Sequence, residues 1–156
     1  MPNKLLDVDD LLYAHDTIRS HVRLVMRLMA DKSEKVDSPE AAAVISFEPA
    51  RSDLEKIVCN LAEGLNRHLV FEEKVLPGLI GEILMEFILM EHRKISRGID
   101  EITSLFRDTG FQNAPVWNQK CRKRVKDYMD FLLEHCETED TILKLFRRNY
   151  SEMVTA

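Results

Sequence analysis

The sequence contains few of the residues that interrupt helices, with five glycines and five prolines among 156 residues. A fold of many short strands needs frequent turns of this kind, so their scarcity argues against a sandwich or a barrel. Seven methionines, together with many leucines, glutamates, lysines and arginines, instead favour long helices. A chain of this length can bury a hydrophobic core without disulfide bonds.

Cysteine is scarce as well. The three cysteines, Cys59, Cys121 and Cys136, are far apart and odd in number. This spacing excludes a paired-cysteine metal motif and a disulfide framework. We expect three thiols in a reducing compartment.

Long apolar runs and a strong excess of one charge are also missing. The most apolar stretch, Ile83 to Met90, contains Glu86 and is too short to span a bilayer. The N-terminal segment carries acidic residues where a signal peptide needs an apolar run. A net charge of -5 gives no reason to expect nucleic acid as a partner. We therefore expect a cytoplasmic protein with neither a membrane nor a nucleic-acid partner.

Apolar residues recur at helical spacing in four long segments. Pro77-Gly78 is expected to end the second segment, and Gly110 the third. Four helices with short connections predict an all-α fold, an antiparallel up-down-up-down four-helix bundle. We expect one domain over residues 1–156, with its core at about 8–148. The predicted helices are Val8–Ala30, Pro49–Val75, Glu82–Asp108 and Pro115–Arg148.

Several helix ends carry their own signals. Asp7 or Asp9 is a candidate N-cap of the first helix, and Asn113 of the fourth. In the irregular stretch between the first two helices, Ser38-Pro39-Glu40 precedes three alanines and predicts a short extra helix. The fourth helix is long enough that we expect a bend or a break near its end.

Histidine is rare, but its five copies follow a repeating order. His68-Leu-Val-Phe-Glu72 and His135-Cys-Glu-Thr-Glu139 each place an imidazole and a carboxylate four residues apart. Residues at that spacing lie on one face of a helix, one turn apart, so both groups can reach the same small volume.

The first and third predicted helices supply a second matching pair. His15-Asp-Thr-Ile resembles His92-Arg-Lys-Ile, so the chain consists of two hairpins with the same set of ligands. Measured from the turns that neighbouring helices share, the four histidines are level within about 2 residues, roughly 3 Å. Charged groups on an inward-facing stripe are costly unless they are paired or bind a metal. The pattern therefore predicts a buried metal site.

Two His-x-x-x-Glu motifs that alternate with two further histidines resemble the hemerythrin-like family of cation-binding domains. Ferritin-like diiron bundles are the nearest alternative, but their motif is Glu-x-x-His. The resemblance implies a non-heme centre of two iron ions, bridged by carboxylates and completed by histidines. The donor set alone also suits zinc or manganese. Carried over, the bridging ligands are Glu72 and Glu139, and the terminal ligands are His15, His68, His92 and His135.

One position departs from the oxygen-carrying hemerythrins. They have a second histidine four residues after the third-helix ligand, where this chain has Ser96. The resemblance then implies an iron with an open coordination position, and it favours binding or sensing of O2 or NO, or iron handling, over reversible oxygen carriage. Two alternatives stay open: an enzyme that repairs iron centres or performs O2, NO or peroxide redox chemistry, and a metal-independent interaction domain.

Other residues near the motifs are weighed as ligands. His21 lies about 120° around the helix from His15 and is kept as a candidate replacement for the missing ligand. Tyr13 and Glu73 are further oxygen donors with less support. Glu91 directly precedes a proposed ligand, so we expect it on the surface or as a hydrogen-bond partner of a ligand.

Overall fold

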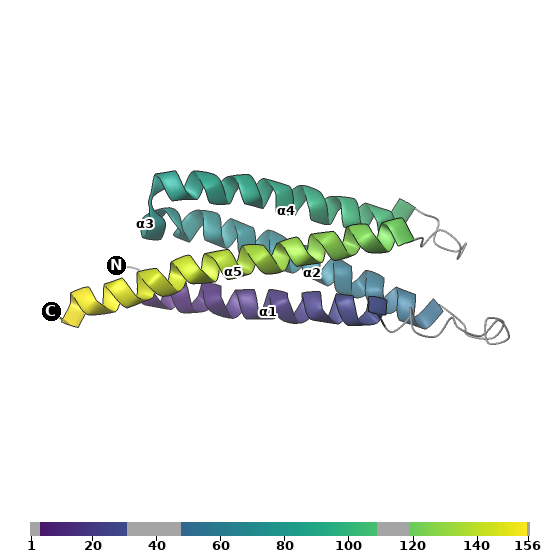
Figure 1. Cartoon of the computed structure of the whole chain (residues 1–156), viewed down its shortest axis with the longest axis horizontal. Helices are drawn as coiled ribbons and strands as arrows, with labels where there is room; N and C mark the ends of the chain where they lie inside the picture. The colour runs from purple at the N-terminus through teal and green to yellow at the C-terminus, as the bar shows by residue number, and fades with distance from the viewer. Residues whose placement is uncertain (1–3, 31–47, 109–118, 156) are drawn as a thin grey trace.

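The computed structural model describes residues 4–30, 48–108 and 119–155, which form four long helices and one short helix (Figure 1). Successive long helices run in opposite directions, and the short helix lies at one end of the bundle. The predicted all-α antiparallel four-helix bundle is therefore confirmed. The helices are α1 (Lys4–Ala30), α2 (Glu48–Val75), α3 (Pro77–Ile80), α4 (Glu82–Asp108) and α5 (Gln119–Thr155).

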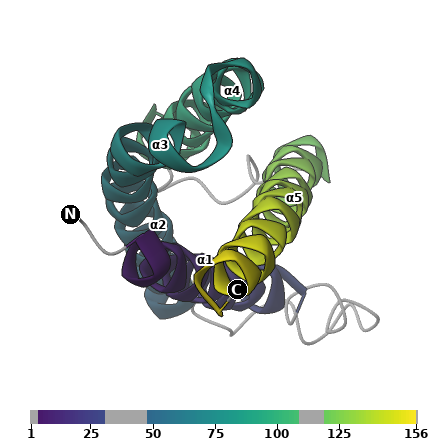
Figure 2. The same cartoon turned by 90° about the vertical axis from the view of Figure 1, so that its left-hand side faces the viewer.

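The long helices pack as a closed ring of neighbours. Helix α1 contacts both α2 and α5, α2 also contacts α4, and α4 contacts α5 (Figure 2). All four long helices can therefore direct side chains into one shared interior.

Helix α1 begins earlier than predicted. It starts at Lys4, whose amine donates a hydrogen bond to the carbonyl of Gly78 at 2.9 Å. Asp7 and Asp9 consequently lie inside the helix, and the prediction that one of them is the N-cap is wrong. The added turn, residues 4–7, precedes the first fully buried residue, Val8, and the hydrogen bond from Lys4 anchors it to Gly78.

The turn between α2 and α4 contains a helical turn that the sequence analysis did not predict. Helices α2 and α4 have the predicted bounds, except that α2 begins one residue before Pro49. The Leu76 N–H donates to the Glu72 carbonyl at 2.8 Å, and the single turn α3 follows. Gly81 then has φ = 82°, a left-handed conformation that glycine adopts without steric cost.

Helix α5 continues without a break to Thr155, seven residues beyond the predicted end at Arg148. Phe146 packs against buried apolar residues and stacks on Tyr150, with ring centroids 5.8 Å apart. These contacts support the helix beyond its predicted end, so the expected break is absent. Four predicted features lie outside the described residues: Gly110, Asn113, Pro115 and the short helix at Ser38-Pro39-Glu40.

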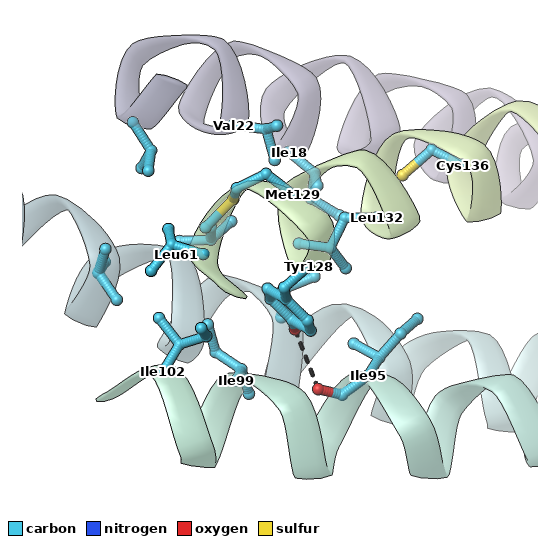
Figure 3. Packing of buried hydrophobic residues seen from close by; sticks show 14 of the residues in the cluster. Ile18, Val22, Leu61, Ile95, Ile99, Ile102, Tyr128, Met129, Leu132 and Cys136 are labelled. Atoms are coloured by element: carbon cyan, nitrogen blue, oxygen red, sulfur yellow. Dashed lines mark hydrogen bonds between the residues drawn. The ribbon is translucent and has the colours of Figure 1, made fainter. Parts of the chain in front are cut away.

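Two apolar clusters fill the interior, and a polar layer separates them. Figure 3 shows the larger one, which includes Ile18, Leu61, Ile95 and Met129. On each long helix the candidate ligands lie between residues of the two clusters. The smaller cluster contains Val8, Leu11, Leu76, Met85, Ile88 and Leu143.

Candidate metal centre

Six polar side chains from the four long helices meet in the layer between the clusters. Each is buried, with at most 7% of its surface exposed, and Glu72 and His15 are fully buried. They are the six residues that the sequence analysis selected: His15, His68, Glu72, His92, His135 and Glu139.

The six side chains form two groups of four that share two members. In each group one ligand atom per residue lies within 4.8 Å of all the others. Glu72 and Glu139 belong to both groups, so the two carboxylates lie between two pairs of imidazoles. The first pair is His15 with His68, and the second is His92 with His135.

Glu72 connects the two groups through its two oxygens. Its Oε1 lies 3.0 Å from Nε2 of His15 and 3.0 Å from Nε2 of His68. Its Oε2 lies 3.3 Å from Nε2 of His92, in the other group. The two oxygens of one carboxylate therefore face different imidazole pairs.

Glu139 occupies the matching position from α5. Its Oε2 lies 3.3 Å from Nε2 of both His15 and His135, and its Oε1 lies 3.5 Å from Nε2 of His92. Each glutamate thus contacts the histidine of its own motif and both His15 and His92, although Oε2 of Glu139 faces one histidine of each pair.

Many polar atoms of this layer lack a hydrogen-bond partner. Among the described residues, seven buried side-chain nitrogen and oxygen atoms have none, and all belong to the candidate ligands. A buried polar atom without a partner costs roughly 1–3 kcal/mol. A cation between carboxylate oxygens and imidazole nitrogens would satisfy the six of these atoms other than Nδ1 of His68, and this donor set suits a transition metal. The residues present therefore fit a metal ion.

The carboxylates also determine the protonation of the cluster. Burial by itself lowers the pKa of His15 and His92, but the carboxylates of Glu139 and Glu72 outweigh it and raise both pKa values to about 10. Burial raises the pKa of Glu72, but the surrounding histidines hold it well below its usual value. The layer thus favours positive charge between two carboxylates, carried by protons or by a metal ion.

Three of the four imidazoles have a carboxylate on the nitrogen that faces away from the cluster. Nδ1 of His15 donates to Asp140 at 2.6 Å, and Nδ1 of His92 donates to Glu73 at 3.1 Å. A carboxylate in this position fixes the tautomer and orientation of a metal-binding histidine. We call these carboxylates outer partners. The third outer partner is Glu91, which lies 2.8 Å from Nδ1 of His135.

The sequence analysis anticipated the position of Glu91 but missed Asp140 and Arg19. Arg19 donates to the second oxygen of Asp140 at 2.6 Å, so Asp140 links α1 to α5. Burial raises the pKa of Asp140, but His15 and Arg19 outweigh it and hold the pKa below its usual value. Two signals were available: Asp140 follows Glu139 as Glu73 follows Glu72, and Arg19 lies one turn after His15.

The secondary candidates do not join either group. His21 is half-buried and its Nδ1 donates to the Thr17 carbonyl at 2.9 Å. Tyr13 is 76% exposed, and Glu73 contacts the far side of His92 instead of the cluster. Ser96 is half-buried on α4 and is in neither group, so each group consists of two imidazoles and the two shared carboxylates.

The fold and the layer together define a helical bundle whose buried histidines and glutamates can hold metal ions. The family model of the hemerythrin HHE cation-binding domain matches residues 6–145, and the chain belongs to this family of metal-binding domains. Searches of curated proteins and of solved structures found no match. None of the described helices carries an apolar stretch long enough to cross a membrane.

Proposed function

We propose that the chain holds two iron ions in this layer and binds a small diatomic ligand, O2 or NO, at an open coordination position. In this proposal Glu72 and Glu139 bridge the ions. His15 and His68 are the terminal ligands of one ion, and His92 and His135 are those of the other. The proposal rests on the two carboxylates that both groups share. A shared carboxylate can give one oxygen to each of two neighbouring ions.

The number of ligands supports an open position. Each ion would be held by two imidazoles and two shared carboxylates, and Ser96 stands where a further histidine could follow His92 by one helical turn. Non-heme iron sites that react with oxygen combine few histidines and carboxylates with open positions. When bound, iron supplies the redox chemistry and the site for the diatomic ligand. The chain orients three of the four imidazoles through their outer partners and would separate the ions from water between two apolar clusters.

Metal analysis of the purified full chain tests this proposal. After anaerobic reconstitution with ferrous iron we expect about two ions per chain, and near-ultraviolet charge-transfer absorption that changes on exposure to O2 or NO. Glu72→Gln, which removes a bridging charge, should reduce the iron content at least by half. Glu63→Gln, at an exposed position of the same helix, is the matched control and should retain two ions. A wild-type chain that retains no iron contradicts the proposal.

The alternative enzyme function differs from this one in a measurable way. A binding or sensing protein retains its iron and returns to its starting spectrum when the diatomic ligand is removed. Transfer of iron to an acceptor chelate faster than buffer exchange, or steady consumption of O2, NO or peroxide with a reductant, would favour the enzyme instead.

A further inference from the structure

The two hairpins match in their outer partners as well as in their ligands. Asp140, which follows Glu139, contacts Nδ1 of His15 at 2.6 Å. Glu73 holds the corresponding place after Glu72 and contacts Nδ1 of His92 at 3.1 Å. The first and third histidines of the repeat therefore have equivalent carboxylates.

The match fails at a single position. Glu91 directly precedes His92, and its carboxylate lies 2.8 Å from Nδ1 of His135. The corresponding residue in the first hairpin is the one before His15, which is Ala14. Its methyl group has no oxygen to offer, and Nδ1 of His68 is buried without a hydrogen-bond partner.

A pocket lies at this position. It has a volume of about 240 Å³ between α1 and α2, and both Ala14 and His68 line it. Ile18 and Leu65 provide apolar walls, and Thr17 and Asn60 add polar groups. His68 is 7% exposed, so the pocket reaches an imidazole that is otherwise enclosed. The pocket therefore borders the one candidate ligand whose Nδ1 lacks a hydrogen-bond partner.

We infer that this pocket binds a small monocarboxylate with an apolar body, whose carboxylate accepts the hydrogen bond from Nδ1 of His68 that Glu91 accepts from His135. The ligand needs a carboxylate because Glu91 supplies one to the corresponding His135. It needs an apolar body because Ile18 and Leu65 form apolar walls of the pocket. A charge-assisted hydrogen bond of this kind is about twice as strong as a neutral one. The inference rests on the proposed function, since it treats His68 as a metal ligand whose basicity the bound carboxylate raises.

Benzoate is a suitable probe, with benzamide as a neutral molecule of the same shape. The full chain, loaded with diamagnetic zinc, is titrated while the ring nitrogens of its histidines are followed by nitrogen-15 NMR. We expect a saturable shift at Nδ1 of His68 with one benzoate per chain. The three histidines with outer partners should shift much less, and benzamide should bind at least tenfold more weakly.

Two variants test the origin of the pocket. Ala14→Glu supplies the missing carboxylate, so benzoate should bind at least tenfold more weakly while the helical circular dichroism is retained. Glu91→Ala removes the corresponding carboxylate from His135, so a second benzoate should bind and the stoichiometry should rise from one to two. If Ala14→Glu does not fold, the Glu91→Ala stoichiometry decides the question alone.

The outcomes separate this inference from the proposed function. The absence of a saturable shift at His68, or equal affinities for benzoate and benzamide, overturns the inference. If the chain takes up no metal at all, the proposed function fails. In that case, benzoate binding to the metal-free chain and its loss in Ala14→Glu still decide whether the pocket binds carboxylates.

Discussion

Asp140 illustrates how one carboxylate outside the ligand set can organise the site. It lies between Nδ1 of His15 and the guanidinium of Arg19, each at 2.6 Å, and is itself buried. Arg19 is held in turn by Asp16 at 3.0 Å. Because His15 is fully buried, it has no water that could replace Asp140 as an acceptor. Asp140 is therefore the partner that orients His15 through Nδ1, while Glu72 and Glu139 contact its Nε2.

Replacing Asp140 with Asn should weaken metal binding. The amide retains the shape of the side chain but removes the charge that orients His15 and raises its basicity. Loss of such a partner typically lowers metal affinity by about 10–100-fold. Competition with a chelator of known affinity measures the change. Asp127→Asn, at an exposed aspartate on the same helix paired with Lys123, should leave the affinity unchanged, and an unchanged affinity in Asp140→Asn would contradict the assigned role.

The candidate ligands could be selected from the sequence because histidine is rare and two of the histidines share the spacing His-x-x-x-Glu. A histidine and a glutamate four residues apart must share a helix face whatever the tertiary structure is. The outer partners depend instead on how neighbouring helices are rotated and on the reach of the side chains. Asp140 contacts a histidine 125 residues away. No local pattern defines that distance, so only the folded chain identifies it.

At the scale of the elements, the approach of α4 to α5 depends on one glycine. A Cβ at Gly98 would overlap the ring of Tyr128. The ring lies against α4, and its hydroxyl donates to the Ile95 carbonyl at 2.9 Å (Figure 3). Burial and the carboxylate of Asp100 raise the pKa of Tyr128, so the hydroxyl stays protonated as a donor. This contact fixes α4 next to α5 near the candidate ligand His92.

Gly98→Ala should therefore lower stability although alanine is the better helix former. Overpacking of a core contact costs about 1–3 kcal/mol, which corresponds to a decrease in Tm of roughly 2–4 °C per kcal/mol for a chain of this size. Gly64→Ala on α2 is the matched control, because a Cβ there has no neighbour within 4 Å. It should stabilise the protein by about 0.5–1 kcal/mol. Calorimetry measures the Tm of both variants. A Tm of Gly98→Ala equal to or above that of the wild type would show that α4 can shift away from Tyr128 at no cost in stability.

The helix boundaries show which part of an element can be predicted locally. The end of α2 and the bounds of α4 agree with the sequence analysis, because proline and glycine act on the backbone directly. The start of α1 and the end of α5 differ, since packing and side-chain contacts extend both. Lys4 donates to the Gly78 carbonyl at the start of α1, and Tyr150 stacks on Phe146 near the end of α5.

At the scale of the whole molecule, the candidate metal site connects all four long helices. Each of α1, α2, α4 and α5 contributes at least one candidate ligand, and the ligands lie in the interior between the two apolar clusters. An ion bound there would contact four elements that are far apart in sequence. Metal binding should therefore stabilise the whole fold and not only one hairpin.

Chelation should lower the Tm of the reconstituted chain. An ion that binds only the folded state, present at 100 times its Kd, adds about 2.7 kcal/mol, and this corresponds to roughly 5–10 °C for a protein of this size. Calorimetry of the iron-loaded chain with and without excess chelator measures the difference. In a variant with both Glu72→Gln and Glu139→Gln, the shared carboxylates are gone, so the chelator should have almost no effect. A wild-type Tm that does not respond to chelation would instead favour the metal-independent interaction domain. The reason is that loss of an ion bound by buried side chains of four helices must change the stability of the bundle.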